Sequence, residues 1–163
     1  MAAVDQIIVL RHARAGRKVA DRSKDFTRSL DRRGREVALR LPQLVEAHLH
    51  PEAIVSSPFR RCLQTVEPLA SDLDLPVAED DRFTPGSSKR SVREAFLEAP
   101  ASSVVSTHGE IIALLFDDRV KCAKGAFWVV ERRDGKLAPS LYVEAPTQRS
   151  AIRKLTPQRF RPL

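Results

Sequence analysis

Two imidazoles and a pair of guanidinium groups follow stretches that the sequence predicts to be strands, and together they could transfer a phosphoryl group. The stretch "IIVLRHARAG" runs from four branched apolar residues into Arg11 and His12. "SSPFRRCLQT" follows a second apolar stretch and brings Arg60 and Arg61, and "STHGE" brings His108 after a later one. In parallel sheets, ligands bind outside the carboxyl ends of the strands. We therefore expect these side chains to meet at one edge of a sheet.

These residue types suit phosphoryl transfer. A neutral imidazole attacks phosphorus and later leaves from a labile phosphoramidate. The phosphoryl group in flight carries negative charge on its equatorial oxygens, and fixed cations around those oxygens lower the barrier. Arginine suits this task because its fork binds two oxygens and stays protonated. A histidine nucleophile, arginines and a second, protonated histidine would need no metal ion and no other cofactor.

Strands alternate with helices along the chain, which predicts an α/β domain. We expect a three-layer sandwich, with a mainly parallel central sheet, helices on both faces and a C-terminal antiparallel hairpin. Asp134 and Gly135 predict the hairpin because they form a favourable turn between two apolar stretches. The expected strands are 6–10, 53–56, 75–78, 103–106, 126–131 and 136–143, and the expected helices are 31–48, 58–73, 92–97 and 110–116.

Local signals refine this pattern. Asp31 is placed to cap the first long helix, and Pro58 is expected to open the second in its first turn. Pro42 and Pro68 predict a kink or a break within these two helices. Residues 14–29 are polar and lack periodicity, which predicts a mobile loop.

The charge of the chain favours an anionic partner. It has 28 Lys and Arg against 21 Asp and Glu, a net charge of +7. Residues 11–40 hold eleven basic and four acidic side chains, and residues 147–163 hold five basic and no acidic ones. We expect one domain over residues 1–145 and a loose, basic C-terminal tail over residues 146–163.

The apolar stretches are short. None approaches the roughly 20 residues that a membrane helix needs, and the first residues lack a basic region followed by an apolar one. We therefore expect a cytoplasmic protein with no membrane partner. Cys62 and Cys122 lack the spacing of metal ligands and are expected to be reduced thiols. The sequence makes no prediction of the oligomeric state.

The order and spacing of the motifs resemble the histidine phosphatase superfamily, which includes the phosphoglycerate mutases, and within it the small SixA-type branch. "LRHARAG" is similar to the family's Arg-His-Gly or Arg-His-Ala after the first strand. "DFTRSLDRRG" is similar to the branch's Asp, Arg, Leu and Gly before the first helix, although Ser-Leu-Asp stands where that branch usually has Pro-Leu-Thr. "SPFRRCLQT" matches Arg61 to the family's second arginine, and "VVSTHG" supplies His108 as the second histidine.

Two further stretches, "QTVEPLA" and "KGAFWVVERRDGKL", resemble the phosphatase domains fused behind MutT-type Nudix hydrolases. Nothing in this chain resembles a Nudix box, and the sequence makes no prediction of a separate Nudix partner. The resemblance implies that His12 becomes phosphohistidine. It also implies that Arg11, Arg61 and His108 bind the phosphate.

The resemblance further implies a Glu or Asp after the third strand that protonates the leaving group. The match there is poor: we assign Asp81, in "AEDDRFTPG", with Glu110 as a rival. The poor match favours a substrate with a good leaving group, such as phosphohistidine, over a general alkyl phosphate. Arg28, in the loop over the substrate, and Arg14, just past the nucleophile, are expected to touch the substrate together with Glu110.

The predicted function is therefore a metal-independent phosphatase with a phosphohistidine intermediate. Its substrate would be a phosphohistidine protein, a nucleotide or a small phosphorylated metabolite. The alternative is a non-catalytic module of the same fold that binds phosphate or nucleotides, which the poor acid match and the basic tail favour. Nucleic-acid binding is disfavoured because the single Trp and the single Tyr lie in the hairpin, away from the arginine-rich segment.

Overall fold

The computed structural model describes residues 4–147 and 158–159. The strands are β1 (Asp5–Arg11), β2 (Ala53–Ser56), β3 (Val77–Glu79), β4 (Ser103–Thr107), β5 (Phe127–Arg133), β6 (Lys136–Val143) and β7 (Gln158–Arg159). The helices are α1 (Arg22–Phe26), α2 (Arg32–Glu46), α3 (Arg60–Leu73), α4 (Lys89–Glu98) and α5 (Gly109–Leu115), with a 3-10 helix, η1 (Asp81–Phe83). None of the helices in this described part is long and apolar enough to cross a membrane.

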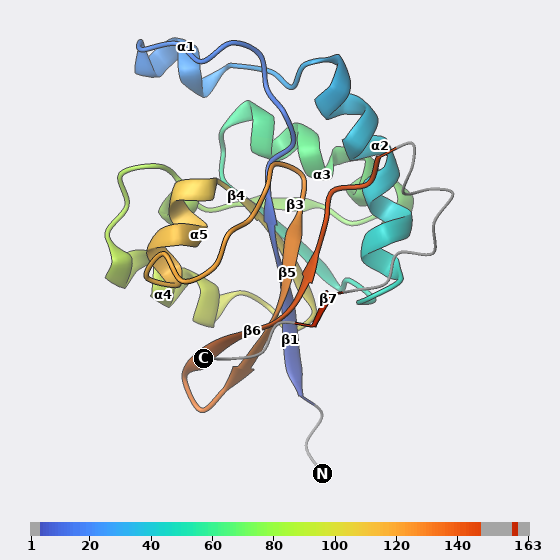
Figure 1. Cartoon of the computed structure of the whole chain (residues 1–163), viewed down its shortest axis with the longest axis vertical. Coiled ribbons are helices and arrows are strands. Elements are labelled where there is room, and N and C mark those ends of the chain that lie inside the picture. Colours follow the sequence, from blue (N-terminus) through green and yellow to red (C-terminus); the bar gives the residue numbers. More distant parts are fainter. Residues whose placement is uncertain (1–3, 148–157, 160–163) are drawn as a thin grey trace.

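A single sheet runs through the domain in the order β3-β2-β4-β1-β5-β6-β7 (Figure 1). The first four of these strands pair in parallel, and β5, β6 and β7 add antiparallel pairs. Strand β1 lies in the middle, with β4 parallel on one side and β5 antiparallel on the other. The strand that carries Arg11 is therefore held by backbone hydrogen bonds along both edges.

Both faces of the sheet are covered, because alternate residues of each strand point to opposite sides. Ile7 and Val9 of β1 pack into one buried cluster with apolar residues of α4 and α5. Ile8 and Leu10 pack into a second cluster with residues of α2 and α3. Figure 1 shows these helix pairs on opposite sides of the strands. The predicted three-layer α/β sandwich with a C-terminal antiparallel hairpin is confirmed.

Several local predictions are also confirmed, and others are wrong. Asp31 caps α2, since its Oδ1 accepts from the backbone N–H of Gly34 at 2.8 Å. The Asp134-Gly135 turn joins β5 to β6, and both residues have positive φ. Helices α2 and α3 continue through Pro42 and Pro68, so neither proline breaks its helix.

Two segments have more structure than expected. Residues 14–29 contain α1, capped by Asp21, and the loop is closed by a bridge between Ala15 and Leu30. Pro58 lies before the N-cap of α3, Phe59, so it does not open that helix. Most of the predicted tail over residues 146–163 lies outside the described residues, but β7 pairs with β6.

The start of α2 lies directly against the chain that follows β1. The backbone N–H of Asp31 donates to the carbonyl oxygen of Arg14 at 3.1 Å. A Cβ on residue 34 would lie 1.9 Å from that same oxygen, so only glycine allows the approach. Gly34 thus determines how closely α2 supports the segment just past the first histidine.

We expect Gly34→Ala to lower the free energy of unfolding by about 2 kcal/mol, because the clash outweighs the roughly 1 kcal/mol that alanine contributes within a helix. Urea denaturation measures this change. Gly16→Ala is the control, since its Cβ would meet nothing closer than the Ser29 carbonyl oxygen at 3.8 Å. Equal stability of the two variants would show that the loop moves aside without cost.

Candidate active site

A cavity of about 1070 Å³ opens at the carboxyl ends of β1, β2 and β4. Arg11 and His12 reach it from the end of β1, Arg61 from the start of α3, and Glu110 from the start of α5. Eight of its lining side chains are Arg or Lys, and three are carboxylates. The cavity is therefore strongly cationic, as the basic segment over residues 11–40 led us to expect.

The hydrogen bonds of His12 determine its tautomer. Its Nδ1 lies 2.8 Å from the carbonyl oxygen of Ala13, so Nδ1 carries the proton and donates it. Its Nε2 lies 3.3 Å from the Nε of Arg61. Arginine has no acceptor, so Nε2 must carry the lone pair. Burial, assisted by neighbouring arginines, lowers the pKa of His12 to about 3. A neutral imidazole, whose Nε2 lone pair accepts a hydrogen bond from Arg61, thus lies at the cavity.

His108 is fully buried and does not line the cavity itself. Its ring centroid is 5.4 Å from that of His12. Its Nδ1 accepts from an Nη2 hydrogen of Arg61 at 3.3 Å, which leaves its Nε2–H to donate to the Ser57 hydroxyl at 2.9 Å. Burial, followed by the charges of its neighbours, lowers the pKa of His108 to about 2. These contacts and the burial of the ring favour the neutral form of His108.

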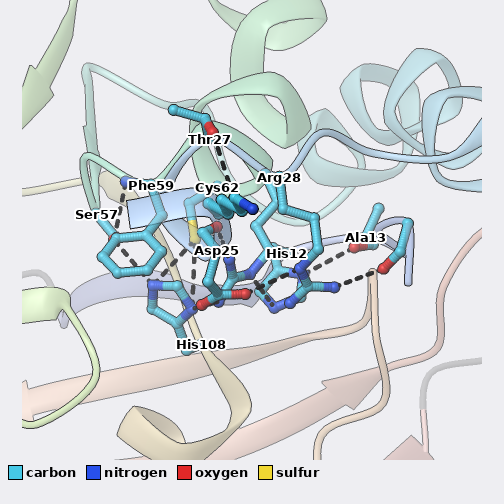
Figure 2. Close-up of polar contacts among 12 residues, drawn as sticks. His12, Ala13, Asp25, Thr27, Arg28, Ser57, Phe59, Cys62 and His108 are labelled. Carbon is cyan, nitrogen blue, oxygen red and sulfur yellow. Dashed lines mark hydrogen bonds and ion pairs between the residues drawn. The ribbon is translucent and has the colours of Figure 1, made fainter. Parts of the chain in front are cut away.

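The guanidinium of Arg61 joins the two histidines to the loop. It is buried, with its Cζ atom 4.9 Å from the centre of the Phe59 ring. The guanidinium contacts Asp25 as well as the two imidazoles. Its Nη1 donates to the backbone carbonyl of Asp25 at 2.9 Å, and its Nη2 lies 3.3 Å from the carboxylate of Asp25. Figure 2 shows Asp25 and His12 close together at this network.

Asp25 is the residue that sequence reasoning missed as a member of the site. It lines the cavity, and its carboxylate binds both Arg61 and, at 3.0 Å, the Nε of Arg28. Arg28 also donates from Nη1 to the carbonyl oxygen of Gly16 at 2.7 Å. The signal was present in "DFTR", where Asp25 precedes Arg28 by three residues, but only the fold brings that pair to Arg61.

Arg11 is held beside the start of α5. Its Nη1 donates to the carbonyl oxygen of Cys122 at 2.8 Å. A Cβ on residue 109 would lie 2.7 Å from its guanidinium carbon, so Gly109 allows the close approach. Its Nε is the one buried side-chain nitrogen or oxygen in the described part of the chain that lacks a hydrogen-bond partner. This cation has donor capacity that the protein does not satisfy.

The remaining expected site residues differ in position. Arg14 lines the cavity and forms an ion pair with Asp31 at 2.8 Å. Glu110 also lines the cavity. Asp81 does not line the cavity: it is exposed in η1, and the neighbouring Asp80 is bound to Arg82. Of the two expected acids, the structure brings only Glu110 to the site.

The described residues include no group of His, Cys, Asp and Glu that could hold a metal ion. Cys62 lies close to the site, with its Sγ 3.5 Å from the Nε2 of His108. Burial raises the pKa of Cys62 to about 12. The thiol therefore stays protonated and is not a nucleophile.

Comparison with known proteins agrees with this picture. Residues 7–84 match the family model of the histidine phosphatase superfamily (branch 1). The 8-oxo-(d)GTP phosphatase of Mycolicibacterium smegmatis is 30% identical over 159 residues, covering 88% of this chain and 49% of that protein. The chain thus spans about half the length of this relative.

Solved structures show the same fold. The protein histidine phosphatase SixA, complexed with tungstate, superposes with a TM-score of 0.70 at 22% identity, over 84% of this chain and 95% of that one. A mycobacterial glucosyl-3-phosphoglycerate phosphatase superposes with a TM-score of 0.65 at 18% identity, over 84% of this chain and 98% of that one. The resemblance expected from the motifs is confirmed.

The buried imidazoles predict a distinct titration. In spectra of the ¹⁵N-histidine-labelled protein, we expect His12 and His108 to keep the shifts of neutral rings down to about pH 4, whereas histidines of the urea-unfolded chain titrate near their ordinary pKa of about 6.5. Because the unfolded chain then binds protons that the folded site does not, the free energy of unfolding falls as the pH drops from about 6.5 toward 3. A folded-state midpoint near 6.5 for either ring would contradict this.

Proposed function

The chain has the sequence pattern and the fold of the histidine phosphatase superfamily, and from this premise we propose that it is a metal-independent phosphatase that works through a phosphohistidine on His12. The observation that carries the proposal is the deprotonated Nε2 of His12 at the cavity, 3.3 Å from the Nε of Arg61. This places a nucleophile and a cation for the transferred group side by side.

In the proposed first step, the Nε2 lone pair attacks phosphorus, a P–N bond forms and the bond to the leaving group breaks. The Nε–H of Arg61 then turns from Nε2 to a phosphoryl oxygen, and Arg11 and Arg28 balance the remaining negative charge. The hydrogen bond from Nδ1 to the carbonyl of Ala13 stabilises the positive charge that the ring gains. In the second step water attacks phosphorus, the P–N bond breaks and Nε2 regains its lone pair.

His108 would enter the reaction when phosphate is bound. Burial and then the charges of its neighbours lower the pKa of His108. A dianionic phosphoryl group offsets the second of these causes, which favours protonation at Nδ1. The protonated ring would then donate its Nδ1–H to the phosphate. Its Nε2–H would continue to donate to the Ser57 hydroxyl. This gives His108 the phosphate-binding role that the family resemblance implies.

Among the carboxylates of the cavity, Glu110 best fits the role of proton donor to the leaving group. It lines the cavity, and within the described residues it forms no ion pair. Asp25 also lines the cavity, but its oxygens are bound to two arginines. We infer that substrates with good leaving groups, phosphohistidine proteins or small phosphorylated molecules, need this proton least.

We expect His12→Ala to lower kcat by about 10³-fold or more, because it removes the nucleophile. The exposed His50 provides the control, since His50→Ala changes a histidine outside the cavity. Brief incubation of the wild type with labelled substrate, followed by quenching, should trap acid-labile, base-stable phosphate on the protein. Normal turnover by His12→Ala would refute the mechanism. Phosphate binding by the wild type without turnover of any substrate would favour the non-catalytic module.

Leaving groups of different basicity test the proton donor. We expect Glu110→Gln to lower kcat for an alkyl phosphate by about 10²-fold, since an alkoxide needs a proton as it departs. With p-nitrophenyl phosphate, whose leaving group needs no proton, the effect should be small. Asp81→Asn is the comparison variant. The opposite result, a selective loss in Asp81→Asn alone, would transfer the role to Asp81.

A further inference from the structure

The cavity contains more positive charge than one phosphate uses. Besides the arginines of the proposed reaction and Arg14, which is paired with Asp31, four basic side chains line it: Arg17, Lys18, Arg22 and Lys124. In the part of the chain that the structure describes, none of the four forms a hydrogen bond or an ion pair through its side chain. Two of the three carboxylates in the cavity are already paired with other arginines. The four cations are therefore available to a ligand.

Lys124 is held next to the proposed nucleophile. The backbone N–H of Gly125 donates to the carbonyl oxygens of Arg11 and His12, each at 3.1 Å. Arg11 in turn binds the carbonyl of Cys122 through Nη1. The turn that carries Lys124 is thus attached on both sides to the end of β1, and its position relative to His12 is set by backbone contacts.

A second part of the cavity wall, which carries Arg17 and Lys18, is attached to the site through Arg28. The Nη1 of Arg28 binds the carbonyl of Gly16, the residue before Arg17. The N–H of Gly16 donates to the carbonyl of Ser29 at 3.0 Å, which closes the base of the loop. Arg17 and Lys18 therefore extend from a segment that an arginine of the reaction site holds in place.

We propose that Arg17, Lys18, Arg22 and Lys124 form an outer anion site, which binds the next phosphate of a substrate that contains a diphosphate. This inference rests on the proposed function, because it takes the His12 end of the cavity as the site of the transferred phosphate. The ligand is a small molecule: the cavity of about 1070 Å³ has the size of a small-molecule site, and the cations line its walls.

The charge balance supports a substrate with several phosphates. A single dianion at the inner site leaves the outer cations facing one another without a counter-charge, a repulsion that costs free energy. A second phosphate would accept charge-assisted hydrogen bonds from them. Glu110, the third carboxylate of the cavity, opposes anion binding near the start of α5, so the second phosphate is expected toward Lys124 and the Arg17 wall.

Two phosphonates that no phosphatase hydrolyses test this site by calorimetry: methylphosphonate and methylenediphosphonate. We expect the wild type to bind the diphosphonate at least about tenfold more tightly, equivalent to one good charge-assisted contact. Lys124→Ala and the double variant Arg17→Ala/Lys18→Ala should each reduce this preference about fivefold or more. Lys136→Ala is the matched control, because it removes one charge from the exposed hairpin, away from the cavity.

Equal affinity of the wild type for both phosphonates would overturn the outer site. An unchanged preference in both cavity variants would also overturn it. The same loss of preference in Lys136→Ala would do so too, because it would show that the preference comes from the overall charge of the protein. Because no turnover is measured, the proposed phosphatase function can fail while the outer site stands. If neither phosphonate binds, both proposals are refuted.

Discussion

The guanidinium of Arg61 is the point on which the site depends. It is a buried cation, and a buried cation is tolerated only when its donors are satisfied. Its Nε and Nη atoms contact the Nε2 of His12, the Nδ1 of His108 and both the carbonyl and the carboxylate of Asp25. One side chain thus connects the end of β1, the end of β4 and the loop that contains α1. Any change that moves this group disturbs all three segments together.

The same network determines which atoms are able to react. Because arginine only donates, its two contacts with imidazoles leave Nε2 of His12 and Nδ1 of His108 as acceptors. Burial favours the neutral form of both rings, so the positive charge of the site comes from guanidinium and ammonium groups. In the proposed mechanism the protein prepares the nucleophile by fixing a tautomer, so no separate base is needed to remove a proton.

Much of this arrangement could be predicted from the sequence, since it depends on local patterns. The apolar runs before Arg11 and His108 identified two central strands, and the helical spacing after them identified the layers that cover the sheet. The rest depends on contacts between distant residues. Helix α1 has five polar and aromatic residues and no apolar period, and it is held by the contact of Asp25 with Arg61, 36 positions away. Asp81 shows a second limit of prediction from the sequence. Its place after the third strand suggested a catalytic acid, but in the structure it lies exposed in η1. The roles of the individual site residues stay predictions.

The place of β1 in the sheet has a consequence for how the protein is made. A ribosome produces β1 before both of its neighbours in the sheet, β4 at Ser103–Thr107 and β5 at Phe127–Arg133. Until these emerge, a strand that is apolar on both faces has two unpaired edges, the kind of surface that aggregates. The nascent chain therefore carries the proposed nucleophile, His12, beside an unpaired strand until β4 and β5 emerge. Folding of the sheet around β1 is a late, long-range event, which is expected to be slow compared with helix formation.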